Sequence, residues 1–376
     1  MADRQSASMF EHPLAMGSLR SWLRLLWRSG GIDARYLPRV LFVTLTTLLT
    51  GSVRLYERLR YGRVVRETRI RPSPVFIVGH WRTGTTHLHL LLCQDPQLGF
   101  VSMFQALAPG FCLVGQGFIK KIVAYWLEKS HPTRLIDNVP LRIDAPQEDE
   151  FALANATPYS FLHVFSFPRQ AADLFARTTL FRGISPEDRA EWAARYLEIL
   201  RKATLLADGK RLVLKNPAHS GRLRAILELF PEAKFIHICR NPYDLFLSTR
   251  RLWEIVLPRS QVQTIAPGEV DRLILQFYAQ LMQQYLADRS LIPAGNLVEV
   301  RFEDLEADPL AEMRRIYETL GLPGFAAAEP ALRTYLASVA DYHKNHYELT
   351  ADVIELVNQH WSFAFEAWGY PRLEPA

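Results

Sequence analysis

Cysteine is scarce in this sequence of 376 residues. Its three cysteines are Cys93, Cys112 and Cys239, and no two of them form a CxxC pair. This scarcity excludes a disulfide framework and a zinc site built on paired cysteines. The sequence therefore predicts a cytoplasmic protein in a reducing compartment. Because 49% of the residues are apolar, the chain can bury a full hydrophobic core.

Lysine is absent from residues 1–71, which contain thirteen arginines and only five acidic residues. A long hydrophobic run is missing too, since the longest, at residues 40–53, falls short of the ~20 residues that span a bilayer. No charged amino terminus leads directly into an apolar segment with a cleavage site, so we expect no secretory signal. We interpret residues 1–71 as a basic N-terminal helical extension and residues 72–376 as the main domain.

The apolar run at 40–53 has two interpretations. It is either a helix packed on the core or an arginine-flanked helix lying in a membrane interface. The second interpretation implies peripheral membrane contact through residues 35–58 and leaves association with a membrane open. Nucleic acid is not expected as a partner, because the basic residues lack interleaved aromatic residues and no nucleic-acid-reading motif accompanies them.

Strand and helix patterns alternate after residue 74. Apolar runs predict strands at 75–78, 210–214, 235–239 and 296–302, and periodic segments predict helices at 87–93, 119–129, 185–206 and 309–320. Residues 95–109 look like a loop, and residues 131–150 look like a long loop or a lid. This alternation predicts the α/β class, with a P-loop-like, doubly wound parallel sheet flanked by helices.

Residues 79–86, Gly-His-Trp-Arg-Thr-Gly-Thr-Thr, have the GxxxxG spacing of a Walker A loop and lie between a predicted strand and a predicted helix. Small residues let successive backbone N–H groups converge on an anion, and the start of a helix adds its positive dipole end. Threonine hydroxyls supply further donors. The segment therefore predicts a phosphate site.

The lysine of a Walker A loop is missing. Thr85 occupies its position, and the positive charge lies within the loop at Arg82. Without that lysine, and without a clear aspartate to hold Mg²⁺ after a strand, a triphosphate is a poor ligand. The loop instead suits a single 5′-phosphate that carries a further charged group, and no metal is required.

These residues resemble the 5′-phosphosulfate loop of the sulfotransferase superfamily, in the branch that carries Arg rather than Lys, as in tyrosylprotein sulfotransferases and many bacterial sulfotransferases. The resemblance implies that residues 72–376 are a sulfotransferase domain and that the co-substrate is 3′-phosphoadenosine-5′-phosphosulfate (PAPS). It also assigns contacts with the 5′-phosphosulfate. Those residues would be Arg82, Thr83, Gly84, Thr85 and Thr86.

A second element of the family follows the strand predicted at 235–239. Arg240 ends that strand, and Ser248 lies eight residues later, about two turns into the next helix. Both side chains can reach one phosphate from different sides. The resemblance makes this pair the 3′-phosphate site, which a nucleotide kinase would not need.

The remaining candidates concern the transfer step. Lys215, in a Lys-x-Pro turn at the end of a strand, resembles the lysine beside the transferring group in tyrosylprotein sulfotransferases and would stabilise charge on the bridging oxygen. Glu148, followed by Glu150, is the candidate base within the acidic cluster 148–150, although three solvated carboxylates are the alternative. His219 is a weaker candidate for orienting Lys215 or the acceptor. Lys344, in the tail, is a candidate contact with the donor nucleotide.

The predicted function is sulfuryl transfer from PAPS to a hydroxyl or amine acceptor by in-line displacement. The acceptor is left open among a small molecule, a lipid and a saccharide. Two alternatives stand beside it, a P-loop nucleotide kinase and a catalytically inactive nucleotide-binding scaffold at a membrane. Five further histidines next to apolar segments are expected to be core residues. They are His80, His87, His89, His163 and His237.

Overall fold

The computed structural model describes residues 12–130, 133, 136, 140–266, 268–340 and 347–375. The chain divides into two compact units. Unit 1 comprises Met1–Thr68, Ser102–Lys202 and Arg251–Val270, and unit 2 comprises Arg69–Val101, Ala203–Arg250 and Asp271–Ala376. The N-terminal segment thus shares its unit with two later segments, and a domain boundary after residue 71 stays a prediction.

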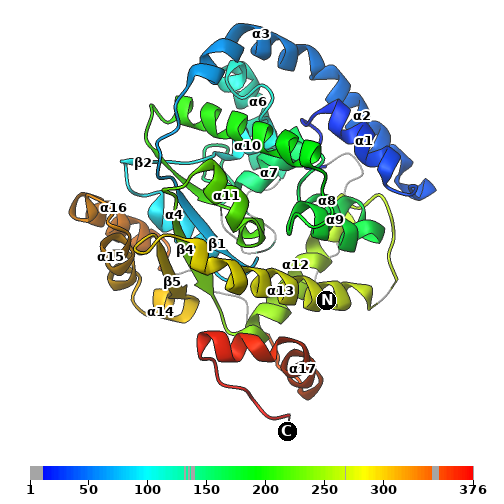
Figure 1. Ribbon diagram of the computed structural model, residues 1–376. Coiled ribbons are helices and arrows are strands. Elements are labelled where there is room, and N and C mark those ends of the chain that lie inside the picture. The colour runs from blue at the N-terminus through cyan, green and yellow to red at the C-terminus, as the bar shows by residue number, and fades with distance from the viewer. Residues whose placement is uncertain are drawn as a thin grey trace. The chain divides into compact units, whose positions relative to one another are not determined.

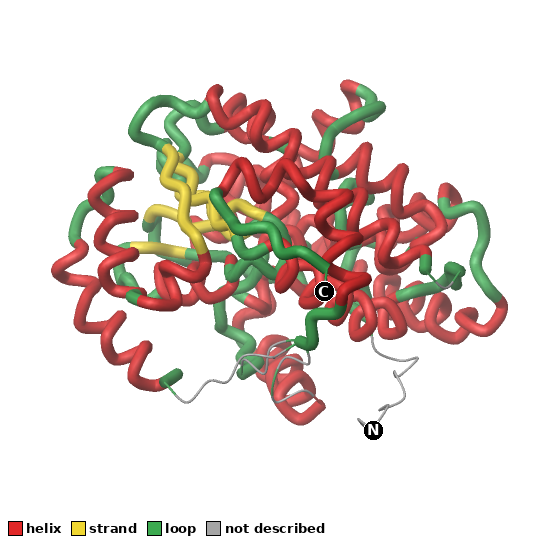
Figure 2. The backbone as a smooth tube through the Cα atoms, turned by 90° about the horizontal axis from the view of Figure 1, so that it is seen from below, coloured by secondary structure: helices red, strands yellow, loops and turns green. Residues whose placement is uncertain are grey.

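Unit 2 contains a parallel five-stranded sheet with the strand order β2-β3-β1-β4-β5. The strands form a single group in both views (Figure 1, Figure 2). Their bounds are Val75–Gly79 for β1, Leu98–Gly99 for β2, Arg211–Lys215 for β3, Lys234–Cys239 for β4 and Leu297–Arg301 for β5. The predicted α/β class and the four predicted strands are confirmed.

The central strand β1 is completely buried because it is covered on both faces, as expected for a parallel sheet. Val75 pairs with Val213 of β3 on one side and with Lys234 of β4 on the other. The core around it joins apolar residues of the strands to helical residues that include Leu88 and Ile316. Burial on both faces explains why these strands are continuous apolar runs rather than alternating ones.

The helices of unit 2 connect or follow these strands in the chain, and two of them, α12 and α13, extend into unit 1. They are α4 (Thr85–Leu92), η4 (Pro217–Gly221), α11 (Leu223–Leu229), α12 (Pro242–Ser260), α13 (Glu269–Asp288), η5 (Arg289–Leu291), α14 (Phe302–Ala307), α15 (Pro309–Leu320), α16 (Phe325–Ser338) and α17 (Ala351–Trp368). The helices α14 and α15 lie beside β5, and α16 packs against α15 (Figure 1). The helix predicted at 309–320 is confirmed.

Unit 1 is helical. Its elements are α1 (Leu19–Arg28), η1 (Ala34–Tyr36), α2 (Leu37–Leu49), α3 (Gly51–Glu67), α5 (Met103–Leu107), η2 (Val114–Gln116), α6 (Phe118–Ser130), α7 (Asp149–Ala156), α8 (His163–Ser166), η3 (Pro168–Gln170), α9 (Ala171–Thr178) and α10 (Pro186–Leu206), which begins in this unit. The helices predicted at 119–129 and 185–206 are confirmed.

The loop predicted at 95–109 is wrong in two places, since it contains β2 and α5. The helix α5 begins with a capping box, in which the Ser102 side chain accepts from the backbone of Gln105 and the Gln105 side chain accepts from that of Ser102. This Ser-x-x-Gln signal stands in the sequence. The described part of 131–150 has no helix before Asp149, as expected for a loop.

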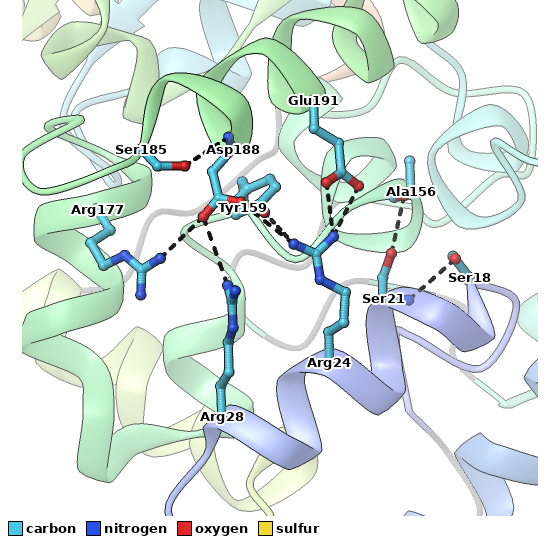
Figure 3. Close-up of polar contacts among 10 residues, drawn as sticks. All are labelled: Ser18, Ser21, Arg24, Arg28, Ala156, Tyr159, Arg177, Ser185, Asp188 and Glu191. Carbon is cyan, nitrogen blue, oxygen red and sulfur yellow. Dashed lines mark hydrogen bonds and ion pairs between the residues drawn. The ribbon is translucent and has the colours of Figure 1, made fainter.

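A polar cluster anchors α1 within unit 1. Figure 3 shows Arg24, Arg28 and Arg177 pointing toward the carboxylate of Asp188, with nitrogen to oxygen distances of 3.5, 3.8 and 3.3 Å. The Tyr159 hydroxyl also donates to Asp188. A single partly buried carboxylate thus pairs with two of the arginines that make the N-terminal segment basic, Arg24 and Arg28.

The apolar run at 40–53 has two different faces. Val40, Val43 and Thr47 are buried in the core of unit 1, whose members include Trp22 and Phe167. The opposite face of α2 and α3 is exposed although it is apolar. Its exposed residues are Leu37, Leu41, Leu45, Leu48, Leu49, Leu55, Tyr56 and Leu59. Core packing therefore explains one face of this segment and leaves the other unexplained.

Candidate functional site

The loop at 79–86 follows β1 and leads into α4, with three residues at positive φ. Gly79, Arg82 and Gly84 have φ values of 144°, 76° and 94°. A Cβ on Gly79 would lie 2.4 Å from the Ile238 carbonyl oxygen, and a Cβ on Gly84 would lie 2.2 Å from the Phe302 ring. Only glycine fits these two positions, which leaves the backbone of the loop open to an anion.

Ser220 of η4 fixes the start of this loop. The Gly79 N–H donates to Ser220 Oγ, and that hydroxyl donates to the Gly79 carbonyl, both at 2.8 Å. Within the loop, Thr83 Oγ1 donates to the His80 carbonyl at 2.8 Å. The first N–H groups of α4, beginning at Gly84, have no partners inside the helix. They are donors already oriented for an anion, and the loop geometry fits a bound phosphate or sulfate.

Arg82 lies between the two phosphate elements predicted from the sequence. Its Nε donates to Ser248 Oγ at 3.0 Å, and its carbonyl oxygen accepts from Nη1 of Arg240 at 3.3 Å. Tyr347 Oη also donates to Ser248 Oγ at 3.5 Å. The structure thus brings Arg82, Arg240 and Ser248 together at the carboxyl edge of the sheet, where open α/β sheets bind ligands.

Phe302 connects the loop with Arg240 and was not identified from the sequence. The guanidinium of Arg240 lies 4.8 Å from the centre of the Phe302 ring, and the same ring packs against Gly84. Asp244 adds an ion pair to Arg240 at 3.8 Å. Phe302 directly follows β5, so its position at the end of a predicted strand was the available signal.

Lys215 ends β3, beside β1 in the sheet, where its partner is Ile77. Its side chain is buried, so Lys215 is not an ordinary surface charge. Burial and then the positive charge of Lys215 lower the pKa of His89, on α4, to about 3. The Lys215 ammonium therefore lies close enough to α4, the helix that follows the loop 79–86, to influence a side chain on it.

His219 is buried in η4, four residues after Lys215. Its Nδ1 lies 3.3 Å from Nη1 of Arg222, and its ring packs edge-on against Phe76 at 5.9 Å. These contacts belong to the core and give His219 a structural position. They offer no support for a direct role in the transfer step.

Glu148 belongs to unit 1, where it is the N-cap of α7. The solvated interpretation of the cluster 148–150 is wrong, because Glu148, Asp149 and Glu150 are all buried. Glu150 Oε1 accepts from Ser160 Oγ at 2.8 Å and from the Phe161 N–H at 2.7 Å, so it ties α7 to the following segment. The assignment of Glu148 as base stays a prediction.

Two further predictions concern Lys344 and the need for a metal ion. Lys344 is outside the described residues. No group of three or more His, Cys, Asp or Glu side chains in the described part of the chain is arranged to hold a metal ion. The site in unit 2 is thus built from arginine, lysine, hydroxyl and backbone N–H groups, which are the groups that bind oxyanions.

Comparisons with known proteins agree with this chemistry. Residues 74–327 match the sequence profile of the sulfotransferase family. The chain is 34% identical over 367 residues to omega-hydroxy-beta-dihydromenaquinone-9 sulfotransferase Stf3 of Mycobacterium bovis and of Mycobacterium tuberculosis, covering 96% of this chain and 92% of each relative.

Solved structures with the same fold include two mycobacterial sulfotransferases. Sulfotransferase STF1 of Mycobacterium tuberculosis has a TM-score of 0.69 at 20% identity, covering 94% of both chains. Sulfotransferase STF9 of Mycobacterium avium has a TM-score of 0.67 at 21% identity, covering 96% of this chain and 98% of that one. With the family match over most of its length, the chain belongs to the sulfotransferase family, and it is a sulfotransferase.

Proposed function

We propose that this sulfotransferase uses PAPS as its donor and transfers the sulfuryl group to an acceptor hydroxyl by in-line displacement. The observation that carries the proposal is the contact between the two predicted phosphate elements, in which Arg82 bonds Ser248 and accepts from Arg240. A 3′-phosphate site beside a 5′-phosphate loop suits PAPS and has no use in an ATP-dependent kinase.

The residues have separate roles in this proposal. Arg82 and residues 83–86 hold the 5′-phosphosulfate, Arg240 and Ser248 anchor the adenosine 3′-phosphate, and Lys344 contacts the donor nucleotide. The acceptor oxygen forms a bond to sulfur as the bond from sulfur to the bridging phosphate oxygen breaks. Arg82 and Lys215 stabilise the charge that develops on that oxygen, and Glu148 takes the acceptor proton. Catalysis rests on positioning and charge stabilisation.

We infer that the acceptor is an apolar molecule with a hydroxyl group, and that the enzyme binds it at a membrane surface. The name of the 34% identical relative gives it an omega-hydroxylated dihydromenaquinone as acceptor. The segment Ala34–Glu67 is the one helical stretch in the described part of the chain that is long and apolar enough to cross a membrane. Only 28% of its most apolar window is buried, whereas a core helix would be mostly buried. Its exposed leucines suit peripheral contact with a membrane surface.

The test is a transfer assay with donor carrying radiolabelled sulfate and a detergent-dispersed omega-hydroxylated quinol as acceptor. We expect transfer by the natural protein, and a loss of about 10²-fold or more in kcat for Lys215→Ala. Transfer of labelled γ-phosphate from Mg²⁺-ATP would favour the kinase alternative instead. Donor binding without transfer to any of the lipid, saccharide and phenol acceptors tried would favour the inactive scaffold, and transfer to saccharides alone would contradict the membrane acceptor.

Donor recognition is measured separately, by calorimetry with 3′,5′-adenosine bisphosphate. Arg240→Ala should weaken binding by about 2–5 kcal/mol, because it removes a charge-assisted partner of the 3′-phosphate. Arg251→Ala removes the same charge from an exposed position on the same helix and should leave the affinity unchanged. Equal affinities of the two variants would refute the assignment of the 3′-phosphate site.

A further inference from the structure

A cavity of about 480 Å³ lies within unit 1, and most of its lining residues belong to α3 and α10. This volume is in the range of small-molecule sites. Six cationic side chains line it, against two carboxylates, Glu57 and Glu198. The cations are Arg54, Arg58, Arg66, Arg195, Arg201 and Lys202. The lining is therefore strongly positive, and none of these residues belongs to the site described above.

Both carboxylates are already engaged. Glu57 pairs with Lys202 at 2.8 Å, and its other oxygen accepts from the N–H groups of Leu113 and Val114 at 2.7 and 3.0 Å. Glu198 pairs with Arg195 at 2.8 Å and with Lys202 at 3.2 Å. The two acids thus neutralise the cations nearest to them and leave the rest of the lining positive.

Three arginines of the lining are not paired with a carboxylate of the described residues. Arg58, Arg66 and Arg201 have no carboxylate within 4.0 Å among the described residues, and they approach the cavity from two helices. Several guanidinium groups that face one cavity repel one another unless an anion lies between them. The planar guanidinium group matches the oxygens of a carboxylate or a phosphate, and a phosphate has enough acceptor oxygens to bind several arginines at once.

Arg54 shows that the cavity is built into the fold. Its guanidinium donates to Thr50 Oγ1 at 2.6 Å and to the Thr47 carbonyl one turn earlier. Its side chain also packs so closely on Gly110 that a Cβ there would lie 2.6 Å from Arg54 Cδ. A guanidinium fixed in this way is pre-organised for a ligand.

The cavity borders the exposed apolar face of α2 and α3. Leu55 lines the cavity and is 56% exposed, and Leu59, one turn further along α3, is 77% exposed. A molecule with an anionic head in the cavity would thus have its apolar part beside these leucines. The ligand that this arrangement fits is amphipathic rather than a free anion.

A second surface helix supports the same orientation. The bonds from Leu113 and Val114 to Glu57 tie the segment before α6 to α3. From there α6 presents Phe118, Tyr125 and Trp126, which are 77%, 58% and 60% exposed. Tyrosine and tryptophan favour the boundary between headgroups and acyl chains, so the exposed aromatic residues of α6 suit a membrane surface.

We propose that this cavity binds the phosphate headgroup of an anionic phospholipid, with the acyl chains along the exposed leucines of α3. The site deepens the membrane contact inferred above and is separate from the sulfate donor site. It would hold unit 1 on the membrane by a specific lipid in addition to general attraction between arginines and anionic headgroups.

The test uses the full chain and dihexanoylphosphatidylglycerol below its micelle concentration, with binding followed by calorimetry. We expect saturable binding by the natural protein. The double variant Arg58→Gln with Arg66→Gln should bind with an affinity that is lower by at least about tenfold. Arg60→Gln with Arg63→Gln is the matched control, because it removes the same charge from the same helix outside the cavity. Its affinity should stay within about twofold of the natural value.

Arg201→Gln tests the second helix and should weaken binding in the same direction. Equal losses in both double variants, or unchanged binding by Arg201→Gln, would overturn the cavity site. Inorganic phosphate and glycerol 3-phosphate should bind at least about tenfold more weakly, because they lack the apolar part. Equal binding of free phosphate would overturn the lipid assignment. All variants should bind 3′,5′-adenosine bisphosphate normally, which shows that unit 2 is folded and keeps this test separate from that of the donor.

Discussion

The Phe302 ring contacts both Gly84 and Arg240. The ring packs on the α-carbon of Gly84 and lies under the guanidinium of Arg240, so a shift of the ring affects both proposed phosphate elements. The resemblance of the two motifs to the sulfotransferase family was enough to predict Arg82, Arg240 and Ser248 as donor contacts. It was not enough for Phe302 or Ser220, because these residues reach the site through the order of the strands, which the spacing of residues does not contain.

Gly84→Ala should therefore reduce both stability and donor binding. The new methyl group would overlap the Phe302 ring and the residue would keep an unfavourable positive φ, with a combined cost of about 2–4 kcal/mol in the free energy of unfolding. Gly209→Ala is the control, since Gly209 also has positive φ but has nothing within 4 Å of its added Cβ. It should cost only about 1 kcal/mol. Equal costs in denaturant titrations would show that Phe302 is not a constraint.

At the scale of elements, local signals predicted the strands and several helices of this chain. The capping box at Ser102 shows that α5 was also predictable, whereas the shortness of β2 leaves no pattern to detect. For the run at 40–53, in contrast, local signals do not decide between two placements. Its sequence supports both core packing and membrane contact, because α2 is apolar on its buried face and on its exposed face.

The two faces of α2 should respond differently to substitution. Leu41→Gln with Leu45→Gln changes two exposed side chains, so we expect less binding to phospholipid vesicles and a change in unfolding free energy within about 0.5 kcal/mol. Val43→Ala changes a fully buried side chain of the same helix and should cost about 1–3 kcal/mol without altering vesicle binding. Cosedimentation and denaturant unfolding measure the two effects. Unchanged vesicle binding by the double variant would contradict the membrane role of this face.

At the scale of the whole molecule, the alternation of strands and helices was sufficient to predict the parallel sheet, but the two units were not predictable. Unit 1 is assembled from three separate stretches of chain. Its contacts join residues far apart in sequence, such as Arg24 and Glu191, whose Nη1 and Oε2 atoms lie 2.8 Å apart. Composition and periodicity describe neighbours along the chain, so they do not report which distant stretches share a core.

Buried histidines are spread over both units. The interpretation of His80, His89, His163 and His237 as core residues is confirmed, whereas His87 is only partly buried. Burial lowers the pKa of His89 to about 3 and those of His80, His163 and His237 to about 4, and that of His12, also buried, to about 4. These side chains remain neutral in the folded protein at pH values where an unfolded chain would bind protons.

Stability should therefore fall as the pH is lowered from about 6.5 to about 4. In this window the unfolded state binds protons at these histidines and the folded state does not, so the free energy of unfolding rises with pH.

His237 offers the cleanest test, because its buried ring stacks on Tyr285 at 3.9 Å and phenylalanine can keep that packing. His237→Phe should lower the slope of unfolding free energy against pH by up to about 1.4 kcal/mol per pH unit. Tyr285→Phe alters the same stack without removing a histidine and should leave the slope unchanged. Denaturant titrations across this window measure both, and an unaltered slope in His237→Phe would show that His237 titrates normally in the folded protein.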